Sequence, residues 1–457
     1  MAGKTEKRLT PERLFLLVYI PLALAMMLAV PLGEAPDEQA HLRQSWLIST
    51  GQFQGEEYTY PANLLTMVNA SYADPAILKG EAFREARLSE ETETVYGDEA
   101  TGIYPRASYL PQGLGMFLAR LFTDRIMILL YSARAGCMLT AGILFYIAIR
   151  RIPAGKFTLL AIACLPLTLQ EAASASCDGM TIAGVSWMAA EMLRRISGEG
   201  DRPVKQLAIS AGIGLCAVLC KLMYVPVLLI GLMAWGRTGE TGKGRTLNRL
   251  VTAGTLLAAL LVWYLSSVST QAGRGGRTAD SLSRLGQLAG NPMILIRAQV
   301  RTAIALLPGW IRQLFGVFGH LNVFSPWALT IPLGVSFLGV ALADSGVRSI
   351  LPEGKQAVKL RVLLVLAVFL CWVLLSGSLL IWWTPEENAL IEGIQGRYFL
   401  PCMICLLICL PEIRPRKARD GKKMNPEAVR YGILGIYLVL SAATIAWLGT
   451  AAWNTFG

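Results

Sequence analysis

The stretch that decides the fold is LFLLVYIPLALAMMLAVPL, from Leu14 to Leu32, which contains no charged residue. A run of about 20 apolar residues is long enough to cross a bilayer as a helix. A basic start precedes it, with Lys4, Lys7, Arg8 and Arg13. A cleavable signal peptide would have a shorter apolar core, of roughly 7–15 residues. We therefore interpret the run as a retained first helix and place the N-terminus in the cytoplasm.

Similar apolar runs recur along the chain, which has 54% hydrophobic and only 16% charged residues. Soluble proteins carry roughly 25% charged residues, so the shortfall favours a membrane protein. With the short basic loops placed inside, the pattern predicts an all-α integral membrane protein with about eleven transmembrane helices and the C-terminus outside. The predicted spans are 14–32, 126–149, 157–171, 178–193, two short helices within 205–236, 250–268, 326–343, 360–383, 398–411 and 431–449.

Two extracytoplasmic segments are expected within this single membrane domain, residues 1–457. The first, 33–108, holds thirteen Asp and Glu against five Lys and Arg, a net charge of −8. The second, 269–325, is rich in arginine and only partly apolar. Between spans, 109–122 is expected to form a helix in the membrane interface. The formal charge of the whole chain is +11, but basic loops beside an anionic leaflet explain it without nucleic acid as a partner.

A first cluster of polar residues follows the first span and contains Asp37, Glu38, His41 and Arg43. Two adjacent carboxylates beside a histidine at the membrane boundary supply a general base or hold a cation. The alternative is a solvated loop in which an acidic residue caps the following helix.

A second cluster, around Arg397 and Tyr398, lies at the outer mouth of the predicted span 398–411. A guanidinium at this position binds a phosphate through two parallel hydrogen bonds. The alternative is that the arginine reaches towards a lipid headgroup, with the tyrosine as an interface residue.

The remaining candidates are scattered near the outer surface, and they are Ser176, Asp178, Lys221, His320 and Asn322. An ionisable residue at membrane depth is a functional candidate by default, although each is equally a structural partner for another. The sequence has no Walker loop, zinc-protease motif or nucleophile elbow, so an ATP-driven pump or a zinc enzyme is not expected.

Two motifs resemble a family of bacterial membrane proteins, domain of unknown function 2142. They are Ala35-Pro-Asp-Glu-Gln-Ala-His41 and Ile394-Gln-Gly-Arg-Tyr-Phe-Leu-Pro401. Between them, Ser176-Cys-Asp178, Lys221-Leu-Met-Tyr224 and Gly316-Val-Phe-Gly-His320 follow in the order of that family. The resemblance covers nearly the whole chain and implies a location in the bacterial plasma membrane.

That family in turn resembles the C-type glycosyltransferases (GT-C), multi-span enzymes with a long first outer loop. The resemblance implies a GT-C-like bundle that moves a sugar from a polyprenyl-phosphate donor to a cell-envelope glycan or lipid-linked acceptor, with inversion. Asp37, with Glu38, would take the acceptor proton, and Arg397 and Lys221 would bind the donor phosphate. The residues expected to position the substrates are His41, Arg43, Asp178, His320 and Tyr398. Some relatives hold a divalent cation such as Mg²⁺ or Mn²⁺ at the carboxylates and others do not, so the metal is left open.

Two other functions compete with the enzyme. A transporter or flippase of lipid-linked saccharides would bind substrate through the same charges without making bonds, and an inverted repeat would favour it. A non-catalytic scaffold of envelope polysaccharide assembly would tolerate the loss of Asp37 and Arg397.

Overall fold

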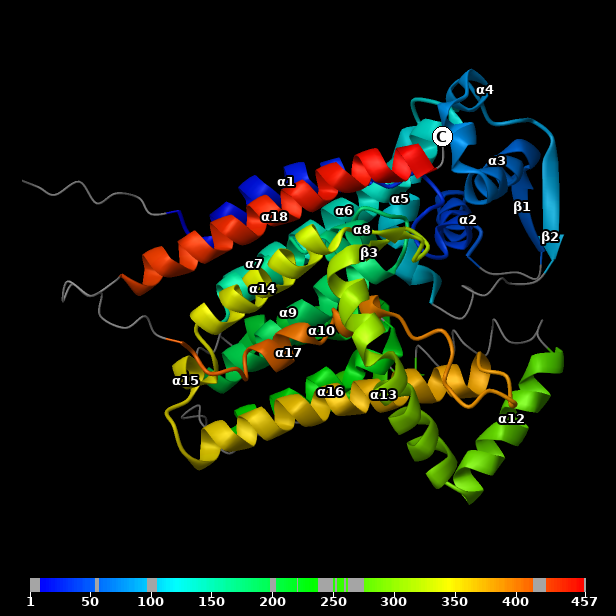
Figure 1. The fold of residues 1–457 in the computed structure, drawn as a ribbon. Coiled ribbons are helices and arrows are strands. Elements are labelled where there is room, and N and C mark those ends of the chain that lie inside the picture. The colour runs from blue at the N-terminus through cyan, green and yellow to red at the C-terminus, as the bar shows by residue number, and fades with distance from the viewer. Residues whose placement is uncertain are drawn as a thin grey trace, which may run out of the picture.

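Most long helices of the computed structural model run side by side in one bundle, and a smaller part with a two-stranded sheet lies at one end (Figure 1). The structure describes residues 9–53, 57–96, 105–197, 203–219, 221–236, 250, 253–258, 260–261, 275–413 and 425–455. Helices α1 (Pro11–Ala29) and α18 (Pro426–Thr455) lie against each other and run in the same direction, so the start of α1 and the end of α18 are at opposite ends of the bundle (Figure 1).

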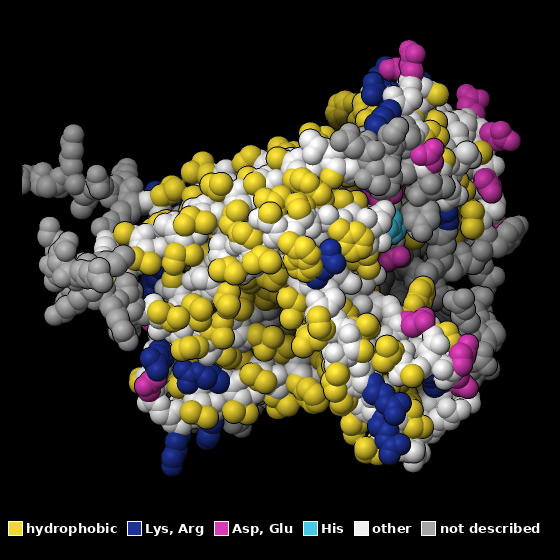
Figure 2. Space-filling model, in the orientation of Figure 1, with side chains coloured by type: hydrophobic (Ala, Val, Ile, Leu, Met, Phe, Trp, Pro, Cys, Tyr) yellow, Lys and Arg dark blue, Asp and Glu magenta, His cyan; other side chains and the backbone are white. Residues whose placement is uncertain are grey.

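The first loop forms the smaller part. Its elements are α2 (Glu38–Ser49), β1 (Glu57–Pro61), α3 (Ala62–Ala73), η1 (Pro75–Lys79), α4 (Glu81–Arg84), β2 (Thr92–Tyr96) and η3 (Arg106–Tyr109). Strands β1 and β2 pair antiparallel, with Glu57 opposite Tyr96 and Pro61 opposite Thr92. Acidic side chains gather at this end of the molecule, whereas hydrophobic side chains cover the flank of the bundle (Figure 2).

The first half of the bundle is α5 (Leu110–Arg120), α6 (Ile126–Arg151), α7 (Lys156–Ala163), α8 (Pro166–Ala172), α9 (Asp178–Ser197), α10 (Pro203–Leu219) and η4 (Leu222–Gly236). The second half is α12 (Gly275–Gly290), α13 (Met293–Gly316), β3 (Val317–Phe318), β4 (Val323–Phe324), α14 (Trp327–Ala343), α15 (Val347–Ile350), α16 (Lys355–Trp382), η5 (Gly396–Phe399) and α17 (Met403–Leu407), before α18.

A break between α7 and α8 interrupts the helix in the middle of the bundle. Pro166 begins α8, and a proline has no N–H and disfavours a helical residue before it. Leu165 is accordingly extended. The break leaves the carbonyl of Ala161 without its usual helical donor, and the Tyr437 hydroxyl of α18 donates to it over 2.7 Å. The short helix α8 that follows the break is buried along its whole length, and its last residues contact α9.

Six helices in the described ranges are long and apolar enough to cross a membrane, so the expected count of eleven is not confirmed. They are Pro11–Ala29, Ile126–Arg151, Met293–Gly316, Trp327–Ile350, Lys355–Trp382 and Pro426–Ala452. Composition alone predicted a span over 157–171, where the proline divides the helix. Within the predicted span 398–411, the helical elements are the end of η5 and the five residues of α17. Most of 250–268 lies outside the described residues.

Of two further segments, the first agrees with the prediction of two short helices and the second differs from its prediction. The 205–236 region is two helical segments, α10 and η4, that meet near Lys221. The 269–325 segment was expected at the outer surface, but α13 within it meets the length and hydropathy of a span. The single membrane domain itself stays an expectation.

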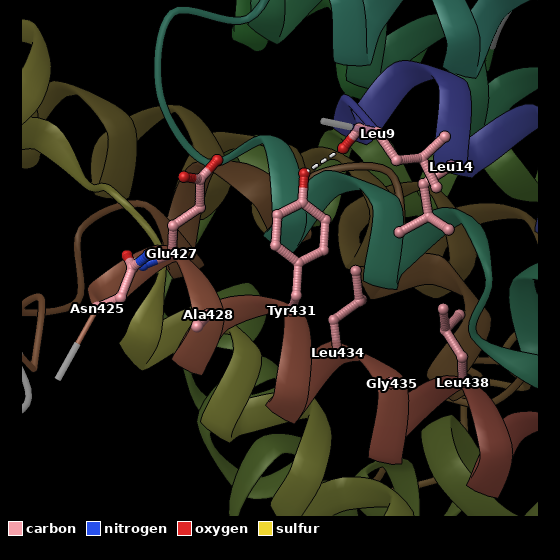
Figure 3. A pocket seen from close by; sticks show the side chains of 9 residues that line it. All are labelled: Leu9, Leu14, Asn425, Glu427, Ala428, Tyr431, Leu434, Gly435 and Leu438. Atoms are coloured by element: carbon pink, nitrogen blue, oxygen red, sulfur yellow. Dashed lines mark hydrogen bonds between the residues drawn. The ribbon is translucent and has the colours of Figure 1, made fainter. Parts of the chain in front are cut away.

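A pocket with a volume of about 510 Å³ lies between the start of α1 and the start of α18, away from α2 (Figures 1 and 3). Its lining is mostly aliphatic, including Leu9, Leu14, Leu434 and Leu438, with Asn425 and Glu427 at one side (Figure 3).

Candidate functional site

Arg397 is the centre of a cluster of charges that four distant segments bring together. It lies on η5, follows the buried Gly396 and has a side chain only 4% exposed. Its three guanidinium nitrogens each approach a different carboxylate. The distances are 3.2 Å from Nη2 to Asp37 Oδ2, 3.4 Å from Nη1 to Glu171 Oε2 and 3.4 Å from Nε to Asp178 Oδ2. A buried guanidinium needs such partners, because its uncompensated charge would be costly.

The three carboxylates differ in their access to solvent. Glu171, at the end of α8, is wholly buried, and Asp178, at the start of α9, is nearly so. Asp37 has a side chain that is 60% exposed. It precedes α2 with a φ of 62°, in the left-handed region that few residues other than glycine, asparagine and aspartate adopt. Asp37 is therefore the carboxylate of the three that is open to solvent.

Lys221 extends the cluster from the junction of α10 and η4. Its Nζ lies 2.5 Å from Asp178 Oδ1, and the lysine is buried. Lys221 and Arg397 both lie near the ring of Tyr398, at 5.1 and 5.3 Å from its centroid. Cations over an aromatic face are attracted by its quadrupole. The structure thus brings together five residues named from the sequence, Asp37, Asp178, Lys221, Arg397 and Tyr398.

Glu38 has different surroundings from its neighbour Asp37. It points into the interior, fully buried, and forms a two-point ion pair with Arg134 of α6 at 2.6 and 2.7 Å. Its carboxylate also accepts hydrogen bonds from the backbone N–H groups of Gly33 and Ala175. Burial alone would raise the pKa of Glu38, but the charge and hydrogen bonds of Arg134 bring that pKa below its usual range.

Arg134 also holds the end of α1. Its guanidinium donates to the carbonyls of Met27, Val30 and Pro31, at 2.7–2.9 Å. The last carbonyls of a helix lack partners within it. Arg134 therefore ties α1, the turn before α2 and α6 into one unit that fixes the position of Asp37.

His41 lies one turn into α2, and its Nδ1 is 2.8 Å from the hydroxyl of Tyr109. Both residues are buried. Burial lowers the pKa of His41 to about 4, despite the opposing charges of Asp178 and Asp37. The imidazole is therefore neutral at physiological pH and is suited to hydrogen bonding.

His320 lies against the turn that carries Asp37. Its Nε2 is 3.0 Å from the carbonyl oxygen of Gly33. The amide of Asn322 donates to the buried Glu34 over 3.2 Å, and burial raises the pKa of Glu34. In contrast, Arg43 lies away from the cluster and hydrogen-bonds Asn69 of α3, within the smaller part at the end of the bundle.

Sequence reasoning missed Glu171, Arg134, Glu34 and Tyr109. Arg134 and Glu171 lie inside runs interpreted as spans, and an ionisable residue within a span is itself a signal of function or of a buried partner. Applied throughout, that rule would have found both. Nothing in the sequence around Tyr109 indicates that its hydroxyl meets His41.

Within the described residues no group of three or more His, Cys, Asp or Glu side chains is arranged to hold a metal ion. Asp37, Glu171 and Asp178 face the guanidinium instead, because each lies within 3.4 Å of one of its nitrogens.

Comparison with known proteins gives one match. A family model described as "Predicted membrane protein (DUF2142)" matches residues 22–407. No curated protein and no solved structure matches the chain. The matched range contains every charged residue of the cluster described above.

Proposed function

The chain belongs to the DUF2142 family of predicted membrane proteins, and from this premise we propose that it is a membrane glycosyltransferase of the bacterial plasma membrane. In this proposal it takes a sugar from a polyprenyl-phosphate donor on the outer face and transfers it, with inversion, to a cell-envelope glycan or lipid-linked acceptor.

The contact between Asp37 and Arg397, 360 residues apart in the chain, carries the proposal. Transfer from a phosphate-linked donor needs a base for the acceptor hydroxyl and a cation for the leaving phosphate. An exposed carboxylate 3.2 Å from a buried guanidinium places these two groups side by side.

The reaction then assigns a role to each group. The acceptor oxygen attacks the anomeric carbon, and its proton passes to the carboxylate of Asp37. The bond between that carbon and the phosphate oxygen breaks, and the phosphate leaves with the electron pair. Arg397 stabilises the charge that develops on this phosphate, with Lys221 close by.

The surrounding residues position these groups. Asp178 holds Lys221 and Arg397 together, and Tyr398 lies beside both cations. His41 and His320 are proposed to orient sugar hydroxyls or the turn itself. Glu38 acts through Arg134 as a positioning residue, because it is wholly enclosed.

The test is sugar transfer by purified protein in nanodiscs, with a panel of labelled polyprenyl-phosphate sugars and envelope acceptors. Asp37→Asn is expected to lose transfer while staying folded. Arg397→Ala is also expected to lose transfer, measured per folded molecule because it leaves Glu171 and Asp178 buried without this cation. The matched controls are Asp124→Asn, an exposed aspartate paired with Arg87, and Arg348→Ala, an exposed arginine paired with Glu353. Both controls should keep transfer.

Transfer that survives in both site variants would remove the assignment of Asp37 and Arg397. If no donor gives transfer but the protein moves a labelled lipid-linked saccharide across the bilayer, the transporter replaces the enzyme. If neither occurs, and both site variants still support polysaccharide assembly in cells, the scaffold replaces it.

A further inference from the structure

Every nitrogen of the Arg397 guanidinium faces a carboxylate as the site stands, and Nε, which forms no hydrogen bond, lies against the buried Asp178. Asp37, Glu171 and Asp178 each lie within 3.4 Å of a different nitrogen of the guanidinium. A phosphate binds a guanidinium best through two N–H groups at once. For a donor phosphate to bind here, one of the carboxylates has to move away.

Only Asp37 is free to leave. Glu171 and Asp178 are enclosed by the bundle, and moving either would leave a charge buried without its partner, at high cost. Asp37 faces solvent. Its contact with Nη2, at 3.2 Å, is also longer than the 2.7–2.9 Å typical of a charge-assisted hydrogen bond.

The balance of charge favours the same exchange. The cluster holds two cations, Arg397 and Lys221, and three carboxylates. A phosphodiester brings a further negative charge. Because like charges at close range repel, the arriving phosphate would push away the nearest mobile anion, Asp37.

We infer that Asp37 occupies the phosphate position on Arg397 until the donor arrives, so that binding of the donor phosphate releases the base. This inference rests on the proposed function and adds an order to it, with the donor first and proton transfer afterwards. A carboxylate that has left a guanidinium accepts a proton more readily. When the phosphate product leaves, Asp37 returns to Arg397 and the base is held again.

The experiment measures binding alone, with a short-chain polyprenyl monophosphate as the probe, by microscale thermophoresis in nanodiscs. Asp37→Asn is the key variant, because asparagine tolerates the left-handed backbone of this position and removes only the charge. We expect it to bind the probe about two- to fivefold more tightly than wild type, as expected for the loss of one exposed ion pair that binding must break. Asp124→Asn, which makes the same change at another exposed Asp–Arg pair, should bind like wild type.

Equal or weaker binding by Asp37→Asn would overturn the inference, as would equal tightening by Asp124→Asn. Arg397→Ala should bind at least tenfold more weakly, and unchanged binding would place the phosphate elsewhere and also overturn it. The two proposals fail separately. Transfer by wild type without tighter binding by Asp37→Asn supports the glycosyltransferase but refutes the displacement of Asp37 by the donor phosphate. Tighter binding by Asp37→Asn without transfer from any donor supports the displacement of Asp37 by the phosphate but refutes the glycosyltransferase.

Discussion

Replacing Glu38 by glutamine tests whether this residue positions the site or reacts in it. The change leaves Arg134 fully buried with three carbonyl partners but no counter-charge. Removing one partner of a buried ion pair typically costs about 3–5 kcal/mol. We expect Glu38→Gln to unfold at a clearly lower temperature and to yield less folded protein.

A double variant, Glu38→Leu with Arg134→Met, separates stability from chemistry. It removes both charges together, and apolar replacement of a buried pair is often close to neutral. The carbonyls that Arg134 bonded still lose their donor, so a residual loss of about 1–3 kcal/mol is expected. The double variant should therefore be more stable than Glu38→Gln.

Transfer per folded molecule is the deciding measurement, with folding followed by thermal unfolding in detergent. If Glu38 positions Asp37 through the buried pair, the double variant retains measurable transfer. A double variant that is well folded but as inactive as Asp37→Asn would refute this reasoning and assign the chemistry to Glu38. A double variant no more stable than Glu38→Gln would refute the expected difference in stability between the two variants. In wild type the contribution of Glu38 is fully present above its ordinary pKa of 4.5. It is lost as the pH falls through the lowered pKa of the folded state.

Three further predictions concern the fold around the site. Because the pKa of His41 falls from 6.5 to about 4 on burial, the unfolded chain binds a proton there before the folded one does. Stability should therefore decrease as the pH falls from about 6.5 to 4, and His41→Gln should flatten this part of a plot of unfolding temperature against pH. Gly115→Ala should destabilise the protein by more than about 1 kcal/mol, because its Cβ would lie 2.2 Å from the carbonyl oxygen of Ser132, whereas Gly309→Ala, in open space, should not; thermal unfolding compares the two. Tyr437→Phe removes the donor at the α7–α8 break and should cost about 1–3 kcal/mol in chemical unfolding, a value near zero showing that the carbonyl finds another partner.

The membrane class followed from composition, because an apolar run long enough to span is a strong signal. The count of spans did not follow. Pro166 divides one apolar run into two short buried helices, and hydropathy averages across such a break. The charges of α9, such as Asp178 and Arg194, also set it apart from the long apolar helices, although most of it is buried.

The sequence indicated which residues form the candidate site better than it indicated which residues they contact. Asp37 and Arg397 lie in the two motifs that carry the family resemblance, Lys221 is an ionisable residue within an apolar run, and the structure brings the three together. The different fates of Asp37 and Glu38 were not predictable. Adjacent residues at a helix start point in different directions, and the sequence does not say which of them faces Arg134, 96 residues away.

The buried pair of Glu38 and Arg134 has a consequence for how the chain enters the membrane during synthesis. An arginine near the middle of a helix makes insertion less favourable by about 2.5–3.5 kcal/mol. Glu38 precedes α6 in the chain, so it is already made when Arg134 emerges from the ribosome. We expect α6 to insert poorly as an isolated segment and efficiently after residues 9–53, and Glu38→Gln should remove part of that help in a glycosylation-mapping insertion assay. Residues 9–53 would then provide the binding surface on which α6 inserts.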